Sequence, residues 1–152
     1  MKAVIQRVKY TKVYANGEDR GEIPFGLFVL LGVGKDDSEK EAIWLADKIR
    51  KMRIFSDENG KMNLSVEGVG GGIAVISNFT LHANATHGNR PDFFSSAPYD
   101  LAKHLYEVFL EQMHSEKLSV ISGIFGADMQ IETICDGPVT IILDTNDVNK
   151  GK

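Results

Sequence analysis

The chain has 152 residues, of which 43% are hydrophobic and 25% charged, with one cysteine and a formal net charge of −4. A chain of this length forms one ordinary domain and buries roughly 70% of the surface that its unfolded form exposes. One cysteine excludes an internal disulfide and a cysteine-based metal site. Because no apolar run reaches the roughly 18 residues of a membrane span, we expect a soluble, cytoplasmic protein without a membrane partner.

The acidic balance hides an asymmetry that bears on nucleic-acid binding. Residues 1–62 hold 12 basic and 10 acidic side chains, whereas residues 63–152 hold 5 and 11. The densest basic group is Arg50, Lys51 and Arg53. Basic residues at a helix end also complement the helix dipole, so this group is either a solvated helix terminus or a small phosphate-binding patch.

The first half of the chain predicts three strands and a helix. Residues 2–8 alternate in polarity, residues 13–15 lead into an Asn-Gly turn, and residues 25–33 suit a buried central strand. Ser38 and Glu41 form a capping box, and apolar residues recur at helical spacing to residue 53. The sequence therefore predicts a helix over 38–53.

The second half predicts a β-hairpin, a second helix and further strands. A turn at residues 57–60 indicates the hairpin, and glycines at 68–72 allow close backbone approach before a strand at 73–77. The polar loop at 82–95 is long enough to suggest a function. Ser96 and Pro98 begin the second helix. Strands are expected around 118–122, 127–134 and 139–143, followed by a frayed tail over 145–152.

These elements indicate an α+β fold. Two main helices among about seven strands, many joined by short turns, favour a single domain over residues 1–144 with a mostly antiparallel, barrel-like sheet. A doubly wound fold is not expected.

Common ligand-binding motifs are incomplete in this sequence. Gly32-Val33-Gly34 lacks the third glycine of a dinucleotide site, and Gly34-Lys35 lacks the rest of a P-loop. The four histidines show no metal-binding spacing, so we expect them on the surface or in loops and expect no metal. Cys135 has no recognisable base nearby in the sequence, which favours a small buried hydrophobe over a nucleophile.

Two segments are left unexplained by composition. Ser77-Asn78-Phe79-Thr80-Leu81 places hydroxyls, an amide and an aromatic ring where a buried strand ends. Asp136-Gly137-Pro138-Val139-Thr140 places a Gly-Pro dipeptide between two strand-like runs, which is typical of a hairpin turn.

Together with three other motifs, these segments closely resemble the D-aminoacyl-tRNA deacylase family of the bacterial and eukaryotic type. All five motifs occur in the family's order and cover the chain to about residue 144. The other three are Met1-Lys2-Ala3-Val4-Ile5-Gln6-Arg7-Val8, Gly88-Asn89-Arg90-Pro91-Asp92-Phe93 and Phe125-Gly126-Ala127-Asp128-Met129. The chain departs from the family at Asn78, where glutamine is usual, and at Cys135, where asparagine is usual.

The resemblance implies an enzyme that hydrolyses the ester of D-aminoacyl-tRNA and of mischarged glycyl-tRNA. It further implies a homodimer whose active sites lie at the subunit interface, with no metal or organic cofactor. Each site would receive Gly137 and Pro138 from the partner chain, joined in this family by a cis bond. Their backbone carbonyls would exclude an L side chain by steric conflict and would accept glycine, which has no side chain.

The resemblance also assigns roles to single residues. Ser77, Asn78, Phe79, Thr80 and Met129 would bind the substrate. Thr80 and Phe79 would lie at the reacting centre, with Thr80 positioning the substrate rather than attacking it, because no activating base is recognisable. The family uses the 2′-hydroxyl of the terminal adenosine, and backbone N–H groups near Phe79 and Thr80 would form an oxyanion hole. Phe79 would either contact the terminal adenine or fill the core.

On this interpretation the group of Arg50, Lys51 and Arg53 becomes a candidate patch for the acceptor end of tRNA, with weak, salt-dependent binding. Two alternatives stay open. One is an animal-type relative with a trans Gly-Pro bond that acts on L-aminoacyl-tRNA errors. The other is a non-catalytic module that binds RNA ends or small molecules, which the departures at Asn78 and Cys135 motivate.

Overall fold

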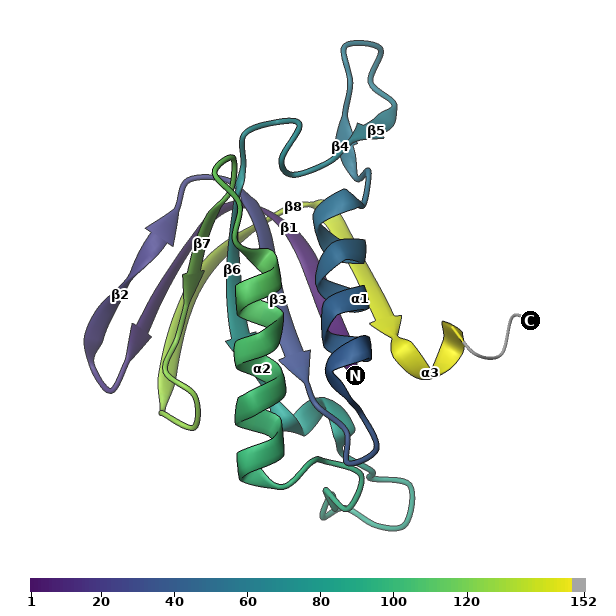
Figure 1. Cartoon of the computed structure of the whole chain (residues 1–152). Helices are drawn as coiled ribbons and strands as arrows, with labels where there is room; N and C mark the ends of the chain where they lie inside the picture. Colours follow the sequence, from purple (N-terminus) through teal and green to yellow (C-terminus); the bar gives the residue numbers. More distant parts are fainter. Residues whose placement is uncertain (149–152) are drawn as a thin grey trace.

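A curved six-stranded sheet carries two long helices on one face, as Figure 1 shows in the computed structural model, which describes residues 1–148. The expected α+β class is confirmed. The elements in chain order are β1 (Lys2–Ala15), β2 (Glu18–Ile23), β3 (Gly26–Gly32), α1 (Glu39–Lys51), β4 (Phe55–Ser56), β5 (Met62–Leu64), β6 (Gly72–Ser77), the 3₁₀ helix η1 (Phe79–His82), α2 (Tyr99–Met113), β7 (Ser119–Ser122), β8 (Met129–Asp144) and α3 (Thr145–Val148).

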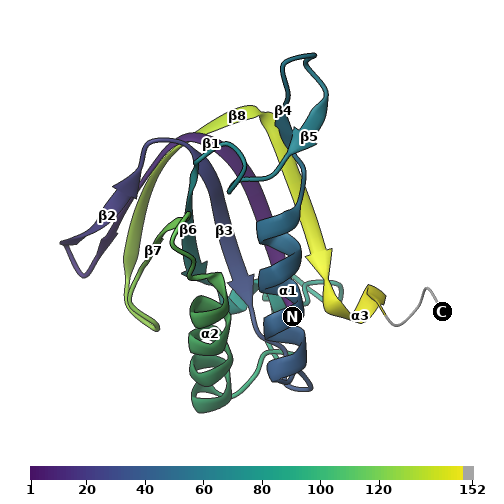
Figure 2. The same ribbon diagram turned by 45° about the horizontal axis from the view of Figure 1, so that its top comes forward.

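The main sheet is mixed, with strand order β2-β1-β3-β6-β7 and β8 on the other side of β1. β1 pairs antiparallel with β2, β3 and β8, whereas β3–β6 and β6–β7 are parallel. In the sequence, α1 comes between β3 and β6, and α2 comes between β6 and β7. These long helical connections allow the joined strands to run parallel. The sheet curls until Gly21 of β2 approaches Ile121 of β7, which produces the expected barrel-like shape (Figure 2).

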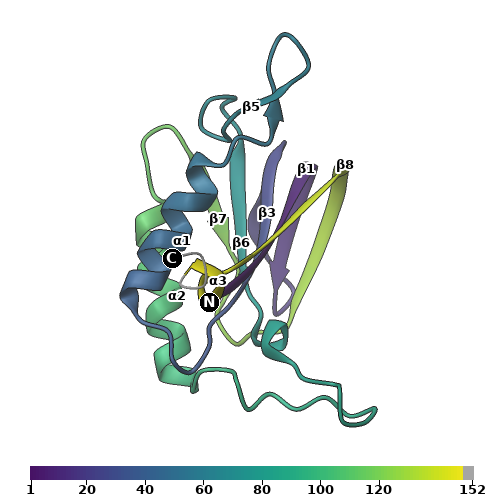
Figure 3. The same cartoon turned by 90° about the vertical axis from the view of Figure 1, so that its right-hand side faces the viewer.

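Alternation along β3 and β6 builds one hydrophobic core on each face of the sheet. Leu27, Val29 and Leu31 pack toward the helices, whereas Phe28 faces the inside of the curl. The larger core lies under α1 and α2, which stand side by side on one face (Figure 3). Because both faces are covered, β3 is a nearly continuous apolar sequence.

Local signals fixed several elements as expected. The Ser38 side chain and backbone both bond Glu41 Oε2, at 2.6 and 2.8 Å, which confirms the capping box of α1. β4 and β5 form the predicted hairpin, which projects from the body (Figure 2). The glycines serve close approach, because a Cβ atom at Gly26 would lie 1.9 Å from the carbonyl oxygen of Gly72.

The hairpin-turn interpretation of Gly137-Pro138 was wrong, because β8 runs through it without a break. Two separate strands were expected here, yet β1 is 14 residues long and pairs with β8 along its length. Gln6 pairs with Thr140 and Val8 with Cys135, so β8 has extra residues at this point and bulges. The Gly137-Pro138 bond is cis, and Gly137 has a φ of +123° that favours glycine.

The first residues of the chain meet the end of β8. The Met1 α-ammonium contacts the Asp37 carboxylate and the Thr145 hydroxyl, and the Thr145 N–H donates to the Met1 carbonyl at 2.9 Å. Residues 145–148 of the expected frayed tail form the short helix α3, and residues 149–152 lie outside the described residues. Among residues 1–148, no helix has the length and apolar character to cross a membrane.

Candidate active site

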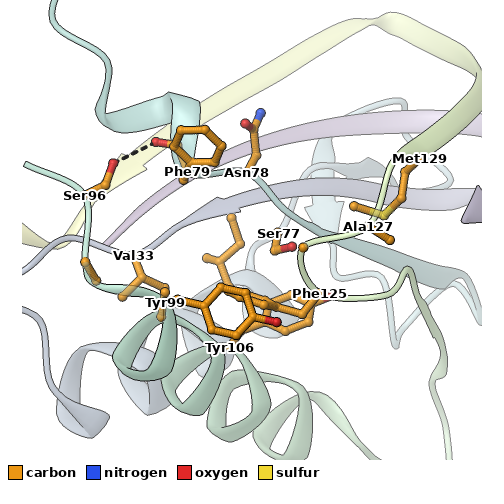
Figure 4. A pocket seen from close by; sticks show the side chains of 14 residues that line it. Val33, Ser77, Asn78, Phe79, Ser96, Tyr99, Tyr106, Phe125, Ala127 and Met129 are labelled. Atoms are coloured by element: carbon orange, nitrogen blue, oxygen red, sulfur yellow. Dashed lines mark hydrogen bonds between the residues drawn. The ribbon is translucent and has the colours of Figure 1, made fainter. Parts of the chain in front are cut away.

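A cavity of about 470 Å³ opens where β6 ends, between η1 and the first half of α2 (Figure 4). One wall is polar, and the floor is apolar and aromatic. The lining residues are Leu31, Val33, Ser77, Asn78, Phe79, Ser96, Ala97, Tyr99, Ala102, Tyr106, Phe125, Gly126, Ala127 and Met129. Four of the predicted substrate-binding residues are among them. None of the fourteen is a carboxylate, a histidine, a lysine or a cysteine, which limits the chemistry that side chains can supply here.

The polar wall forms where β6 leaves the sheet. Ser77 is the last residue of β6, and the Asn78 N–H still donates to the Leu31 carbonyl of β3 at 2.8 Å. The Asn78 side chain then caps η1, because its Oδ1 accepts from the Thr80 N–H at 3.2 Å and also from the Thr80 hydroxyl. Thr80, a fifth predicted substrate-binding residue, does not line the cavity; it is held next to the lining residue Asn78, which engages its hydroxyl.

Phe79 presents its ring to solvent at the rim of the cavity. It is 58% exposed, so it does not fill the core. Phe93 contacts it edge-on, with ring centroids 5.0 Å apart, and the Ser96 hydroxyl donates to its carbonyl at 3.1 Å. The Phe93 contact positions the ring and the Ser96 bond holds the backbone behind it, while more than half of the side chain stays exposed.

Sequence reasoning missed the aromatic floor. Tyr106 is buried, and its hydroxyl donates to the Val75 carbonyl at 2.8 Å. Burial raises the pKa of Tyr106, so this phenol stays protonated at neutral pH. Phe125 packs against Tyr99 and Tyr106 at centroid distances of 5.1 and 5.6 Å. The two tyrosines lie seven residues apart on α2, a helical spacing that could have revealed their shared face.

Met129 begins β8 and closes the cavity from the other side. A Cβ atom at Gly123 would lie 2.1 Å from the Met129 sulfur. Gly123 therefore provides the space that the methionine side chain needs at this wall. No other residue type fits there unless Met129 moves.

Gly137 and Pro138 do not line this cavity in their own chain. They lie opposite Arg7 of β1, which pairs with Leu27 of β3, which in turn pairs with Ile73 of β6. Ser77 is four residues further along β6, or about 13 Å at the usual rise. Both residues of the dipeptide are exposed. A single chain therefore keeps the expected filter and the expected binding wall apart.

Arg7 lies directly behind the dipeptide. Its Nη1 donates to the Ile54 carbonyl at 2.8 Å, and its Nε lies 3.1 Å from Asp136 Oδ2. Lys9 approaches the same carboxylate at 3.8 Å but is largely exposed. Arg7 thus connects the Gly137 bulge with the segment that leads into the β4–β5 hairpin.

The predicted basic patch lies near the other end of the helices. Arg50 pairs with Glu67 at 2.6 Å and donates to the Gln112 carbonyl at 2.9 Å, at the far end of α2 from Tyr99. The Arg50 hydrogen bond lowers the pKa of Glu67, which keeps that carboxylate charged. Lys51 pairs with Asp47 in its own helix at 3.4 Å. Arg53 donates to the Asn63 side chain at 3.2 Å and is exposed.

Two other sequence expectations failed. His82 was expected on the surface or in a loop, yet it is buried against Gly32 and Gly34, and burial lowers its pKa. Cys135 was expected to be buried, yet it is exposed on β8, where its thiol donates to the Gln6 side-chain oxygen at 2.9 Å. Within residues 1–148, no three His, Cys, Asp or Glu side chains gather closely enough to hold a metal ion.

Comparisons with known proteins agree with this architecture. A family profile described as D-Tyr-tRNA(Tyr) deacylase matches residues 4–144. A curated D-aminoacyl-tRNA deacylase of Fusobacterium nucleatum is 53% identical over 149 residues, covering 98% of this chain and 99% of that protein. One of Thermosipho africanus is 50% identical over 148 residues, covering 97% and 99%.

Solved structures show the same fold. One named c-Myc DNA Unwinding Element Binding Protein has a TM-score of 0.86 at 40% identity, covering 95% of this chain and 99% of that one. Another, described as a probable eukaryotic D-amino acid tRNA deacylase, has a TM-score of 0.79 at 17% identity, covering 94% and 98%. The second likeness concerns the fold alone.

Proposed function

The chain belongs to the D-aminoacyl-tRNA deacylase family and is a hydrolase of that class, and we propose that it cleaves D-aminoacyl-tRNA with a backbone filter supplied by a second copy of the chain. Water adds to the ester carbonyl carbon, the bond from that carbon to the ribose oxygen breaks, and the ribose oxygen leaves with a proton. The products are the free D-amino acid and tRNA with its terminal hydroxyls restored.

The cavity at the end of β6 is the observation that carries this proposal. Its volume of about 470 Å³ falls in the range of small-ligand sites and suits a nucleoside with an attached amino acid. The open ring of Phe79 offers a surface on which an unpaired adenine can stack. Ser77 and Asn78 supply polar groups beside it, and Met129 closes the opposite wall.

The chiral filter requires a homodimer, because Gly137 and Pro138 lie outside the cavity of their own chain. β8 supports such an assembly, since its described partner is β1 alone and its other edge is open to a second copy. Ile134 and Ile142 of β8 are 57% and 71% exposed, so this strand offers apolar side chains for a second copy to bury. The bulge then enters the partner's cavity.

In that position, the exposed backbone of Gly137 and Pro138 faces the α-carbon of the bound ester. A D-aminoacyl group turns its hydrogen toward the carbonyls, and an L side chain would collide with them. Glycine has no side chain to exclude, so glycyl-tRNA is a second substrate.

Catalysis depends on the substrate's own 2′-hydroxyl. The cavity lining has no carboxylate, histidine, lysine or cysteine to activate a nucleophile, and the phenol of Tyr106 stays protonated. The 2′-hydroxyl is vicinal to the ester and assists the attack of water. The Phe79 and Thr80 N–H groups polarise the carbonyl, with the Thr80 N–H released from Asn78 when the ester binds.

The group of Arg50, Lys51 and Arg53 forms a weak contact for tRNA, and its three residues differ in how free they are to bind a phosphate. Arg50 is held by Glu67 and Gln112, so its free capacity is small. Arg53 is exposed and precedes Ile54, whose carbonyl accepts from Arg7 behind the filter. In a homodimer, Arg53 would therefore accompany the filter of its own chain toward the substrate in the partner's cavity.

The test incubates catalytic amounts of the purified protein with D-Tyr-tRNA, L-Tyr-tRNA and Gly-tRNA and measures the acylated fraction over time. We expect rapid loss of the D-Tyr and glycyl esters and no loss of the L-Tyr ester beyond the buffer control. Intact D-Tyr-tRNA would reject the deacylase and favour a non-catalytic RNA-binding module. Cleavage of L-Tyr-tRNA would reject the filter and favour the animal-type alternative.

A further inference from the structure

Residues 83–95 make up most of the connection from η1 to α2, form a hairpin-like turn, and are called the 83–95 loop below. Asn84 and Asp92 exchange two backbone hydrogen bonds of 2.9 Å, which close the loop at its base. Asn84 Oδ1 also accepts from the Thr86 N–H at 3.1 Å and the Thr86 hydroxyl at 2.7 Å. The loop projects past the sheet and helices (Figure 3), so its tip is presented to solvent on a closed base.

The base of the 83–95 loop is fixed to the wall of the cavity. The Phe93 ring contacts Phe79, and the Lys35 N–H donates to the Ser95 carbonyl at 3.1 Å. The next residue, Ser96, lines the cavity and donates to the Phe79 carbonyl. A partner that binds the loop is therefore close to a ligand that fills the cavity.

The 83–95 loop carries one strongly exposed aromatic ring and one exposed arginine. Phe94 is 85% exposed, the highest value among the exposed large hydrophobic side chains of residues 1–148. Arg90 is exposed and has no hydrogen-bond or ion-pair partner within that part of the chain. Asp92, the acidic residue of the loop, uses Oδ1 to accept from the Phe94 N–H at 3.3 Å. Within the described residues, neither the exposed Phe94 ring nor the exposed Arg90 side chain makes a ring contact, hydrogen bond or ion pair that would stabilise the fold.

We propose that the 83–95 loop binds the single-stranded RNA that precedes the terminal adenosine, with Phe94 stacking on a base and Arg90 contacting a phosphate. Aromatic rings that stack on bases, next to cations that meet the backbone, are the general means of holding single strands. A single strongly exposed ring on a polar loop favours this partner over a protein, whose interface would need a wider apolar patch. The inference rests on the proposed tRNA substrate.

The test compares two substrates that differ in length, D-Tyr-tRNA and 2′(3′)-O-D-tyrosyl-adenosine, which lacks every preceding nucleotide. Phe94→Leu and Arg90→Ala should each raise KM for D-Tyr-tRNA about tenfold and leave hydrolysis of the adenosine ester unchanged. Phe94→Tyr keeps a ring and should restore the wild-type KM. Arg20→Ala, an exposed cation on β2, is the matched control. Arg90→Ala should also reduce the dependence of KM on salt.

The outcomes distinguish a failure of the loop proposal from a failure of the proposed deacylase function. Wild-type protein that cleaves neither substrate would reject the proposed function itself. If it cleaves both, equal loss on the two substrates, or no loss on tRNA, would overturn the role of the loop. Light scattering with size-exclusion chromatography completes the test, because dissociation of an oligomer by Phe94→Leu would identify the loop as a contact between protein chains instead.

Discussion

Arg7 and Asp136 form an ion pair behind the Gly137 bulge, with Arg7 Nε 3.1 Å from Asp136 Oδ2. The same guanidinium donates to the Ile54 carbonyl from Nη1. One side chain therefore fixes the strand just before Gly137 against the segment before β4. A lysine at position 7 keeps the charge but cannot make both contacts from a planar group.

We expect Arg7→Lys to loosen the filter. The ratio of deacylation rates on D-Tyr-tRNA and L-Tyr-tRNA should fall about tenfold, because the backbone that we propose as the filter is then less firmly held. Lys9→Ala is the matched control, because Lys9 is exposed and its contact with the same carboxylate is long, at 3.8 Å. An unchanged ratio in a folded Arg7→Lys variant would show that Asp136 and Ile54 do not position the filter.

Thr80→Ala should keep most of the deacylase activity, within roughly twofold of wild type. The Thr80 hydroxyl is engaged by Asn78, and the cavity offers no base to activate it. A substrate with a 2′-deoxy terminal adenosine should show almost no turnover. Rates on both substrates, measured with both proteins, decide the matter, and the reverse pattern would make Thr80 the nucleophile.

Elements with local signals could be predicted from the sequence, and those that depend on distant pairing could not. The Ser38–Glu41 capping box predicted the start of α1 because both partners lie in one helical turn. Gly137-Pro138 indicated a turn because its local sequence favours one. The long pairing of β1 with β8 determined the structure instead, and no residue near position 137 reveals the length of β1.

The residues of the candidate site also fall into those that a local motif reveals and those that only distant packing brings together. The wall of Ser77, Asn78 and Phe79 is contiguous in the sequence, so one motif located it. The floor combines Tyr106 of α2 with Phe125 from the segment before β8, and only the crossover of α2 over the sheet brings them together. His82 is buried because Gly32 and Gly34 leave room beside β3, a packing relationship that histidine spacing cannot report.

Arg50→Ala should reduce the free energy of unfolding by about 1–3 kcal/mol, more than it reduces tRNA binding. Arg50 joins α1 to Glu67 and to the end of α2, so its removal leaves a carboxylate and a carbonyl without their partner. Lys51→Ala, at an exposed pair, should change stability by less than about 0.5 kcal/mol. Urea unfolding of both variants measures this.

The stabilisation from the Arg50–Glu67 pair should depend on pH. The pKa of Glu67 is lowered in the folded protein, so its contribution is present above its ordinary pKa of 4.5 and is lost as the pH falls through the folded value. The difference in stability between wild type and Arg50→Ala should therefore shrink in acid. A difference that stays constant down to the acid transition would contradict the assigned pair.

His82 should make the protein less stable as the pH falls below about 6.5. Burial lowers the pKa of His82 in the folded state, so below its ordinary value of 6.5 the unfolded chain binds more protons than the folded one. Stability then rises with pH from the folded pKa to 6.5 and levels off above it. His82→Gln should remove this dependence, whereas His87→Gln, on the exposed loop, should retain it. Urea midpoints at pH 5.5 and 7.5 provide the comparison, and equal pH dependence in wild type and His82→Gln would show that His82 is not the group responsible.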